Sequence, residues 1–179
     1  ARRSGLAVRT AVMLIDDVVV VHHQPRLDGS RQMPEVGIVI PAHASALGKA
    51  IMAFDAKITD DILGADLRDM TGTTVTDPHA VRAGLADVRA TGLAESVEEA
   101  VLGECELAAV LTDRMGGPIG AVGVVATAEQ WPLDPSVSSM LRDVARNTSR
   151  ELGASSWPPA VQDDRATDKD AWRRRSRTG

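Results

Sequence analysis

The sequence predicts an α+β domain with an antiparallel sheet, and three observations lead to this fold class. Short segments rich in β-branched residues occur in pairs separated by turn residues, as in β-hairpins. Between the pairs, residues 43–54 carry apolar side chains at helical spacing. Two Asp-Pro pairs, beginning at Asp77 and Asp134, are typical of a helix N-cap followed by proline in the first turn.

Period-two and β-branched patterns predict the strands, and turn residues separate them. The predicted strands are residues 7–14, 18–23, 36–40, 107–113 and 119–127. Asp16 and Asp17 form the expected turn of the first hairpin, and residues 114–118 that of the last. Residues 119–127 are small and apolar on both faces, so we expect a central strand there.

Capping residues and the 3.6-residue period predict four helices. They are residues 43–54, a short helix at 59–66 with Thr59 as N-cap, a helix from Asp77-Pro78 to Gly92, and a helix from Asp134-Pro135 to Gly153. The first of them should be buried, because Lys49 is its only charged residue. Its small residues allow another backbone or a ligand to come close.

A length of 179 residues predicts one domain, which we place at residues 1–153. The run of serine, tryptophan and proline at residues 155–159 interrupts all periodicity. We therefore expect residues 154–179 to form a disordered, solvated tail. Asp28-Gly29-Ser30 predicts a turn or loop between the first hairpin and the third strand.

Composition and charge exclude several classes of partner. Aromatic residues make up only 2%, which argues against nucleic-acid binding by base stacking. The net charge of −5 makes the chain a poor partner for phosphate backbones. The basic run at residues 173–177 is interpreted as a solvated tail, with DNA contact as the alternative. No apolar run approaches the ~20 residues of a membrane span, and the single cysteine is compatible with a cytoplasmic protein.

No pattern in the sequence points to catalysis, a cofactor or a metal. There is no Gly-x-Ser-x-Gly elbow and no Walker or dinucleotide-binding glycine pattern. His22 and His23 are adjacent on a predicted strand, so their side chains point to opposite faces and do not pair as metal ligands. We therefore expect no catalytic residues, no metal ligands and no cofactor.

Four segments, in this order, resemble the effector-binding domain of IclR-type transcriptional regulators. Residues 41–50 (PAHASALGKA) resemble the start of that domain's buried helix, and residues 85–96 (LADVRATGLAES) its second helix and the following turn. Glu98-Glu99 and residues 103–109 (GECELAA) resemble its acidic stretch and cysteine-bearing strand. The resemblance covers roughly residues 6–153.

This resemblance implies a GAF-like fold, in which a curved antiparallel sheet has helices on both faces and a ligand cavity on one side. It also implies a winged helix-turn-helix ahead of this segment, through which DNA would be bound. Family members form homodimers or homotetramers, and their effectors are often small carboxylic acids, including aromatic ones.

Candidate effector-binding residues follow from the same resemblance. Ala46 and Leu47, preceded by Ser45, match the family's pocket positions, where free backbone N–H groups favour an anion. The alternative is that these small residues only permit tight packing. Cys105 matches a pocket cysteine, and a plain core residue is the alternative. Glu95 and Ser96 match a polar position in the cavity, and a solvated acidic turn is the alternative.

Val124 and Ala126 match two positions that hold serines in relatives that bind small polar acids. Because both are apolar here, two hydrogen-bond donors are missing, which favours a larger effector such as an aromatic or branched acid. Met33 is an expected flexible filler of the same pocket.

The sequence thus predicts a ligand-sensing domain of a DNA-binding regulator, in which a small acid changes the arrangement of subunits and so DNA binding. Two alternatives stay open at this point. One is a stand-alone binding protein or enzyme acting on a small acid, and the other is an oligomerisation domain with an unused cavity.

Overall fold

The computed structural model describes residues 4–26 and 35–161. The elements in chain order are β1 (Ala7–Leu14), β2 (Asp17–Gln24), β3 (Val39–Pro41), the short 3-10 helix η1 (Ala42–Ala44), α1 (Ala46–Met52), α2 (Ala56–Leu63), α3 (Pro78–Thr91), β4 (Ala94–Val97), β5 (Glu104–Thr112), β6 (Pro118–Thr127), η2 (Ala128–Gln130) and α4 (Pro135–Glu151). Three sequence predictions lie outside the described residues: the turn at Asp28, the filler Met33 and the basic run at 173–177.

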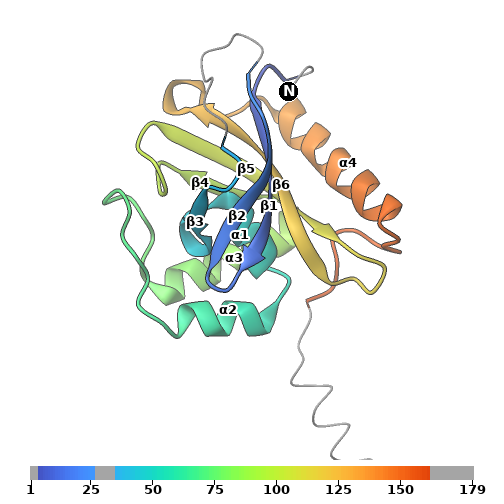
Figure 1. Ribbon diagram of the computed structural model, residues 1–179, viewed down its shortest axis with the longest axis horizontal. Helices are drawn as coiled ribbons and strands as arrows, with labels where there is room; N and C mark the ends of the chain where they lie inside the picture. Colours follow the sequence, from blue (N-terminus) through green and yellow to red (C-terminus); the bar gives the residue numbers. More distant parts are fainter. Residues whose placement is uncertain (1–3, 27–34, 162–179) are drawn as a thin grey trace, which may run out of the picture.

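The six strands form one curved sheet in the order β3-β2-β1-β6-β5-β4, visible in Figure 1. Every neighbouring pair is antiparallel. The hairpins β1–β2 and β5–β6 arise from the two turns that the sequence predicts, and β6 has neighbours on both sides. The predicted α+β class with an antiparallel sheet is therefore confirmed.

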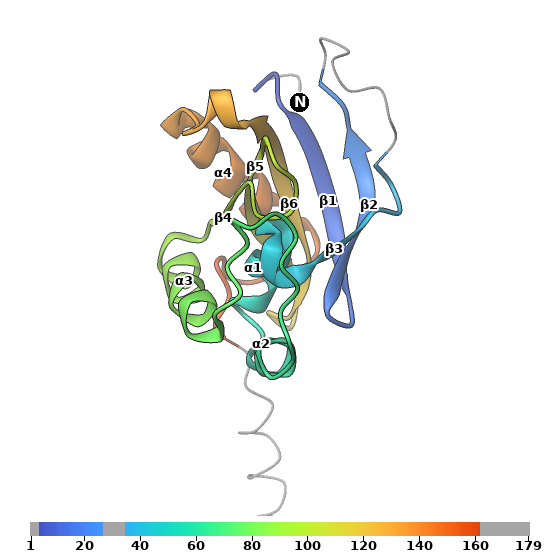
Figure 2. The same cartoon turned by 90° about the vertical axis from the view of Figure 1, so that its left-hand side faces the viewer.

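Helices pack on both faces of this sheet and divide the core in two (Figures 1 and 2). Strand residues alternate between the faces, so each strand contributes to both halves. On one face α1, α2 and α3 bury a cluster that includes Ala11, Val20, Ala108, Val110 and Ala121 of the strands. On the other face α4 buries a second cluster, with Leu107, Ala109, Val122, Val124 and Ala126 from the strands.

Helix α1 lies very close to the 3-10 helix before it, and Gly48 makes this approach feasible. A β-carbon at position 48 would lie 2.2 Å from the carbonyl oxygen of Ala42 and 2.4 Å from its Cα. Only glycine fits at such a distance. The small residues predicted to keep this helix slim thus do so, and they allow α1 to contact five strands of the sheet, β1, β2, β4, β5 and β6.

The predicted starts of the two long helices are confirmed. Asp77 accepts a hydrogen bond from the backbone N–H of His79 at 3.1 Å, and Asp134 accepts one from Ser136 at 2.8 Å. Gly92 ends α3 in the left-handed conformation, with φ of 75°. Such caps satisfy backbone groups that the helix leaves free.

Two local predictions need correction. The short helix predicted at 59–66 begins instead at Ala56, with Asp55 as N-cap, and Thr59 lies inside it. The Thr59 hydroxyl donates to the Met52 carbonyl at 2.6 Å, which fixes α2 against α1. Residues 94–97, expected as part of a turn, form the edge strand β4, because their alternate residues Ala94 and Ser96 are buried against β5 and α1.

Trp157, beyond the expected domain boundary at residue 153, packs against the body of the domain. Its indole N–H donates to the carbonyl of Val110 at 2.9 Å. A β-carbon on Gly92 would lie 2.9 Å from the indole ring, which shows how tightly the ring covers this helix end. Most of the predicted tail lies outside the described residues, and its disorder stays a prediction.

Because Trp157 contacts both halves of the core, Trp157→Ala should lower the free energy of unfolding by about 2 kcal/mol. Trp157→Phe keeps an aromatic ring but loses the hydrogen bond to Val110, so it should lower the free energy of unfolding by about 1 kcal/mol. Urea denaturation followed by circular dichroism measures both. Equal stability of all three proteins would show that the domain does end at residue 153.

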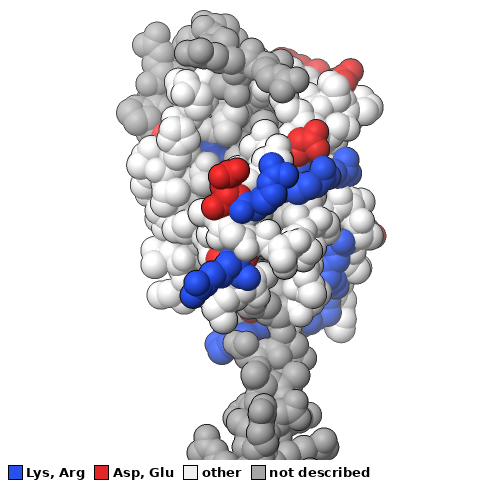
Figure 3. Space-filling view, turned by 90° about the vertical axis from the view of Figure 1, so that its right-hand side faces the viewer, with Lys and Arg blue, Asp and Glu red and all other residues white. Residues whose placement is uncertain are grey.

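Figure 3 shows the α4 side of the molecule, where acidic side chains lie among the basic ones. Arg146 on this helix pairs with Asp143 at 3.2 Å. This face is therefore of mixed charge, unlike the continuous basic surfaces that bind nucleic acid. Within the described ranges, no helix has the length and apolar character needed to cross a bilayer.

Candidate functional site

The residues predicted at the start of α1 come together with a carboxylate that the sequence analysis did not select. Ser45 is the N-cap of α1, and its hydroxyl accepts from the backbone N–H of Leu47 at 3.1 Å. The same hydroxyl donates to Oε2 of Glu106 at 3.1 Å. That oxygen also accepts from the backbone N–H of Ala46 at 3.0 Å and of Leu47 at 3.4 Å. Glu106 of β5 thus occupies the donors that were predicted to bind an effector's carboxylate.

Glu106 belongs to a larger buried ionic cluster, which we define as Arg9, Glu35, Glu104 and Glu106. Arg9 comes from β1, and its guanidinium pairs with Glu35, with Glu104 at 3.1 Å and with Glu106 at 3.7 Å. Arg9 and Glu106 are each only 6% exposed. His23 of β2 lies 3.6 Å from Glu35 at the edge of the cluster. One guanidinium therefore faces three carboxylates away from water.

The protonation of this cluster reflects its burial. Burial raises the pKa of Glu106, while Arg9 and the hydrogen bonds from Ser45, Leu47 and Ala46 oppose the rise. Burial alone would lower the pKa of Arg9, but its hydrogen bond to Glu35 and the three carboxylate charges raise it above its usual value. The second oxygen of Glu106, Oε1, is buried and has no hydrogen-bond donor among the described residues.

Glu95 and Ser96, predicted together, lie on opposite faces of β4. Ser96 is buried on the α1 side, where its hydroxyl donates to the carbonyl of Ala44 at 2.8 Å. Glu95 is exposed on the other side, although its backbone carbonyl accepts from the Lys49 ammonium at 3.2 Å. Only Ser96 is therefore placed near Ser45 and Glu106.

Cys105, Val124 and Ala126 are not brought to α1. Val124 and Ala126 belong to the core cluster under α4, and Cys105 is the cross-strand partner of Ala126. The residues on the α1 side are their neighbours in sequence, Glu106, Gly123 and Val125. A one-residue offset moves every side chain of a strand to the other face. Val124 and Ala126 therefore lie on the opposite face of the sheet from Ser45 and Ala46, and the large apolar effector inferred from them stays a prediction.

Cys105 is fully buried, and burial raises the pKa of its thiol. Because the thiolate is the reactive form, native protein should react with iodoacetamide far more slowly than protein unfolded in urea. Mass spectrometry of timed samples measures the difference. Comparable rates in both states would place Cys105 at an accessible site.

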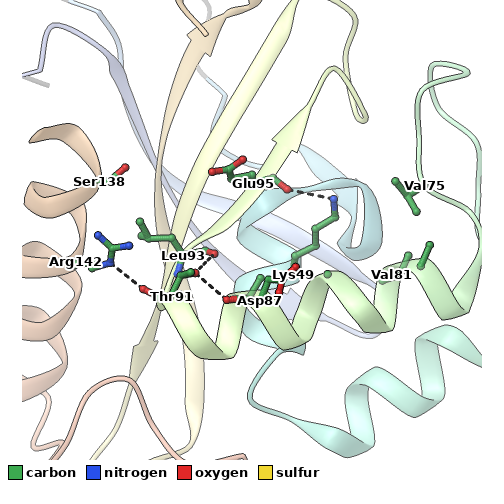
Figure 4. Close-up of a pocket in the computed structure, with 12 residues that line it drawn as sticks. Lys49, Val75, Val81, Asp87, Thr91, Leu93, Glu95, Ser138 and Arg142 are labelled. Atoms are coloured by element: carbon green, nitrogen blue, oxygen red, sulfur yellow. Dashed lines mark hydrogen bonds between the residues drawn. The ribbon is translucent and has the colours of Figure 1, made fainter. Parts of the chain in front are cut away.

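A second feature is a groove of about 440 Å³ between α3, β4 and α4, shown in Figure 4. Its walls combine apolar side chains with charged ones of both signs. The lining residues are Lys49, Val75, Ala80, Val81, Gly84, Asp87, Val88, Thr91, Leu93, Glu95, Ser138 and Arg142. Glu95 is thus a groove residue, on the opposite face of β4 from the ionic cluster.

Within residues 4–26 and 35–161, no group of three or more His, Cys, Asp or Glu side chains is placed to hold a metal ion. The ionic cluster has the guanidinium of Arg9 at its centre, in the place that a metal ion would need. The sequence contains a partial indication of this ionic cluster. Arg9 and Glu106 are charged residues at inward-facing positions of largely apolar strands.

The comparisons with known proteins agree with this architecture. Residues 1–150 match the family model described as bacterial transcriptional regulator IclR C-terminal. A glycerol operon regulatory protein of Streptomyces coelicolor is 39% identical over 158 residues, which cover 86% of this chain and 62% of that protein. The repressor AllR of Klebsiella pneumoniae is 29% identical over 154 residues, covering 84% of this chain and 57% of AllR. The chain thus spans about three fifths of the curated relatives' length.

Solved structures share the fold. The IclR protein of Thermotoga maritima superposes with a TM-score of 0.79 at 24% identity, over 85% of this chain and 63% of that one. An IclR homologue from Microbacterium hydrocarbonoxydans, solved with 4-hydroxybenzoate, gives 0.74 at 22% identity, over 84% of this chain and 62% of that one. By its matched family model, its relatives and its fold, the chain belongs to the IclR family of bacterial transcriptional regulators and corresponds to their C-terminal, effector-binding domain.

Proposed function

We propose that this domain senses a small neutral, hydroxylated molecule on the α1 side of the sheet, and that binding changes DNA binding by the full-length regulator. The sensor would act in the cytoplasm as a homodimer or homotetramer, with DNA held by a separate helix-turn-helix domain. Effector binding must then favour one arrangement of subunits over another, since a ligand shifts an equilibrium only through differential affinity.

The proposed class of ligand rests on one observation. The hydrogen-bond donors at the start of α1, the Ser45 hydroxyl and the backbone N–H groups of Ala46 and Leu47, already bind the carboxylate of Glu106. An acidic effector placed there would have to displace Glu106 and would meet the negative charges of Glu104 and Glu35 as well. Like charges repel strongly in a buried site, because water screens them little there. Oε1 of Glu106 lies 3.7 Å from the Arg9 guanidinium but accepts no hydrogen bond within the described ranges, so it could accept one from a hydroxyl group.

The relatives named as glycerol operon regulatory proteins make polyols the first candidates. The competing class is the small organic acid that the sequence predicts. It draws support from two structural relatives, which were solved with 3-hydroxybenzoic acid and 4-hydroxybenzoate. Ser45, Ala46, Leu47 and Ser96 would contact either ligand, whereas Glu106 distinguishes between them.

A thermal-shift panel on the purified chain tests this proposal. Glycerol and related polyols are compared with pyruvate and 4-hydroxybenzoate, over concentrations at which a specific shift saturates. A ligand at ~100 times its dissociation constant should add roughly 2.7 kcal/mol of stability. Glu106→Gln should weaken the polyol response, whereas Glu104→Gln, which removes a charge from the same cluster but keeps the hydrogen bonds to α1, should retain it.

The outcomes separate the parts of the proposal. Saturable shifts with acids alone would retain the sensor and overturn the neutral ligand class. No saturable shift in either class would count against ligand sensing by this site. For the link to DNA, a mobility-shift assay with the full-length regulator and its own promoter should show that the effective polyol changes the affinity.

A further inference from the structure

The groove between α3, β4 and α4 has the size of a small-molecule site and is separate from the ionic cluster. Its volume of about 440 Å³ falls in the range of cavities that hold small ligands. Glu95 opens onto it, whereas the next residue, Ser96, is buried on the α1 side of β4. A ligand in the groove would therefore lie across β4 from Glu106.

Opposite charges face this groove without neutralising each other. The carboxylate of Glu95 extends from β4 toward the side where Ser138 and Arg142 of α4 lie (Figure 4). Arg142 uses its Nε to donate to the carbonyl of Thr91 at 2.8 Å. Within the described ranges no ion pair or hydrogen bond joins the Glu95 carboxylate to any group, and none engages the two outer nitrogens of Arg142. The groove thus offers the Glu95 carboxylate and the forked Arg142 donor on facing walls, with a second carboxylate, Asp87 of α3, also in its lining.

The other cation that lines the groove, Lys49, already has partners. Lys49 of α1 binds Glu99 and the backbone carbonyl of Glu95. It therefore holds β4 in place and neutralises Glu99 rather than Glu95. The charged side chains that remain available to a ligand are Glu95 and Arg142, together with Asp87 of α3.

The remaining wall is apolar and leaves open space. Val88 of α3 and Leu93, just before β4, line the groove together with Val81. Gly84 stands one turn before Val88, and a β-carbon on it would meet no atom within 4 Å. An aliphatic group of modest size could lie there and be removed from water.

We propose that this groove binds a small zwitterion, an aliphatic α-amino acid, with its ammonium at Glu95, its carboxylate at Arg142 and Ser138, and its side chain on Val88 and Leu93. Guanidinium–carboxylate and ammonium–carboxylate contacts are the strong, charge-assisted hydrogen bonds. A ligand that carries both charges satisfies both walls at once, which a simple amine or acid cannot do. This site is additional to the effector site and does not depend on the proposed polyol ligand.

Calorimetric titration of the purified chain with L-leucine tests the proposal, with two probes that each lack one charge. Isopentylamine lacks the carboxylate, and 4-methylpentanoate lacks the ammonium. Leucine should bind about tenfold or more tightly than either probe, which is about 1.4 kcal/mol or more. Glu95→Gln should weaken leucine binding by a similar factor and leave 4-methylpentanoate unaffected.

Gly84 provides the test of location. Gly84→Leu would place a side chain in the groove and should abolish leucine binding, whereas Gly84→Ala should preserve it. Circular dichroism confirms that both variants are folded. The proposal is overturned if leucine does not bind, if 4-methylpentanoate binds as tightly as leucine, or if folded Gly84→Leu protein binds leucine as the wild type does. None of these results would bear on the Glu106 variants and their response to polyols.

Discussion

Gly48→Ala is expected to lower the free energy of unfolding by about 3 kcal/mol or more. The added β-carbon would lie 2.2 Å from the carbonyl oxygen of Ala42 and 2.6 Å from its carbonyl carbon, and both are backbone atoms that no side-chain rotation can move. Either η1 or α1 must shift, and α1 packs against β5 and β6 at the centre of the sheet. Urea denaturation measures the loss as a lower midpoint.

Gly84→Ala is the matched control for Gly48→Ala. Both glycines lie in helices, but a β-carbon on Gly84 has open space around it. Because alanine favours a helix over glycine, this variant should gain up to about 1 kcal/mol. If the two variants shifted the midpoint in the same direction and to the same extent, close packing of α1 against Ala42 would not be the reason for glycine at position 48.

Arg9→Met should lower the free energy of unfolding by about 3–5 kcal/mol at neutral pH, because it removes the cation that faces the buried carboxylate of Glu106. The loss should shrink as the pH falls. Burial already raises the pKa of Glu106, and removal of Arg9 takes away the main opposing influence. The folded variant therefore holds a proton on Glu106 that the unfolded chain has released, so its stability increases as the pH falls through the folded pKa.

Denaturation of Arg9→Met and wild type at several pH values, within the range where the wild type stays folded, checks this sign. Arg68→Met is the control, because Arg68 forms an exposed pair with Asp17 and its side chain is 60% exposed. Exposed pairs contribute ~0–1 kcal/mol, so the control should be nearly neutral and insensitive to pH. A loss for Arg9→Met that stays constant with pH would show that Glu106 does not take up the proton.

The order of the elements and the caps of the long helices could be predicted from the sequence, because they depend on local signals. Asp77 and Asp134 fix their helix starts through bonds to residues two positions along. The start of the short helix was predicted four residues too late, because Asp55 and Thr59 are both suitable N-cap residues. Only the packing of Thr59 on Met52 decides between them.

The candidate site was harder to predict because its residues come together only through strand register. Glu106 lies one position beyond Cys105, and this offset decides whether a side chain points to α1 or to α4. Its partner Arg9 is far away in the chain, so no local pattern joins the two residues. A charged residue at an inward-facing position of an apolar strand was the available signal, since such a charge is costly unless it is paired.

The place of β1 in the sheet also constrains how the chain folds. β1 lies between β2, which follows it at once, and β6, the last strand, with Ala7 opposite Val125. During synthesis β1 therefore lacks one of its two neighbouring strands until nearly the whole domain has left the ribosome. Contacts between such distant segments slow folding and prolong exposure of apolar surface. In the proposed full-length regulator, a DNA-binding domain at the N-terminus would be fully synthesised before the effector-binding domain can complete its sheet.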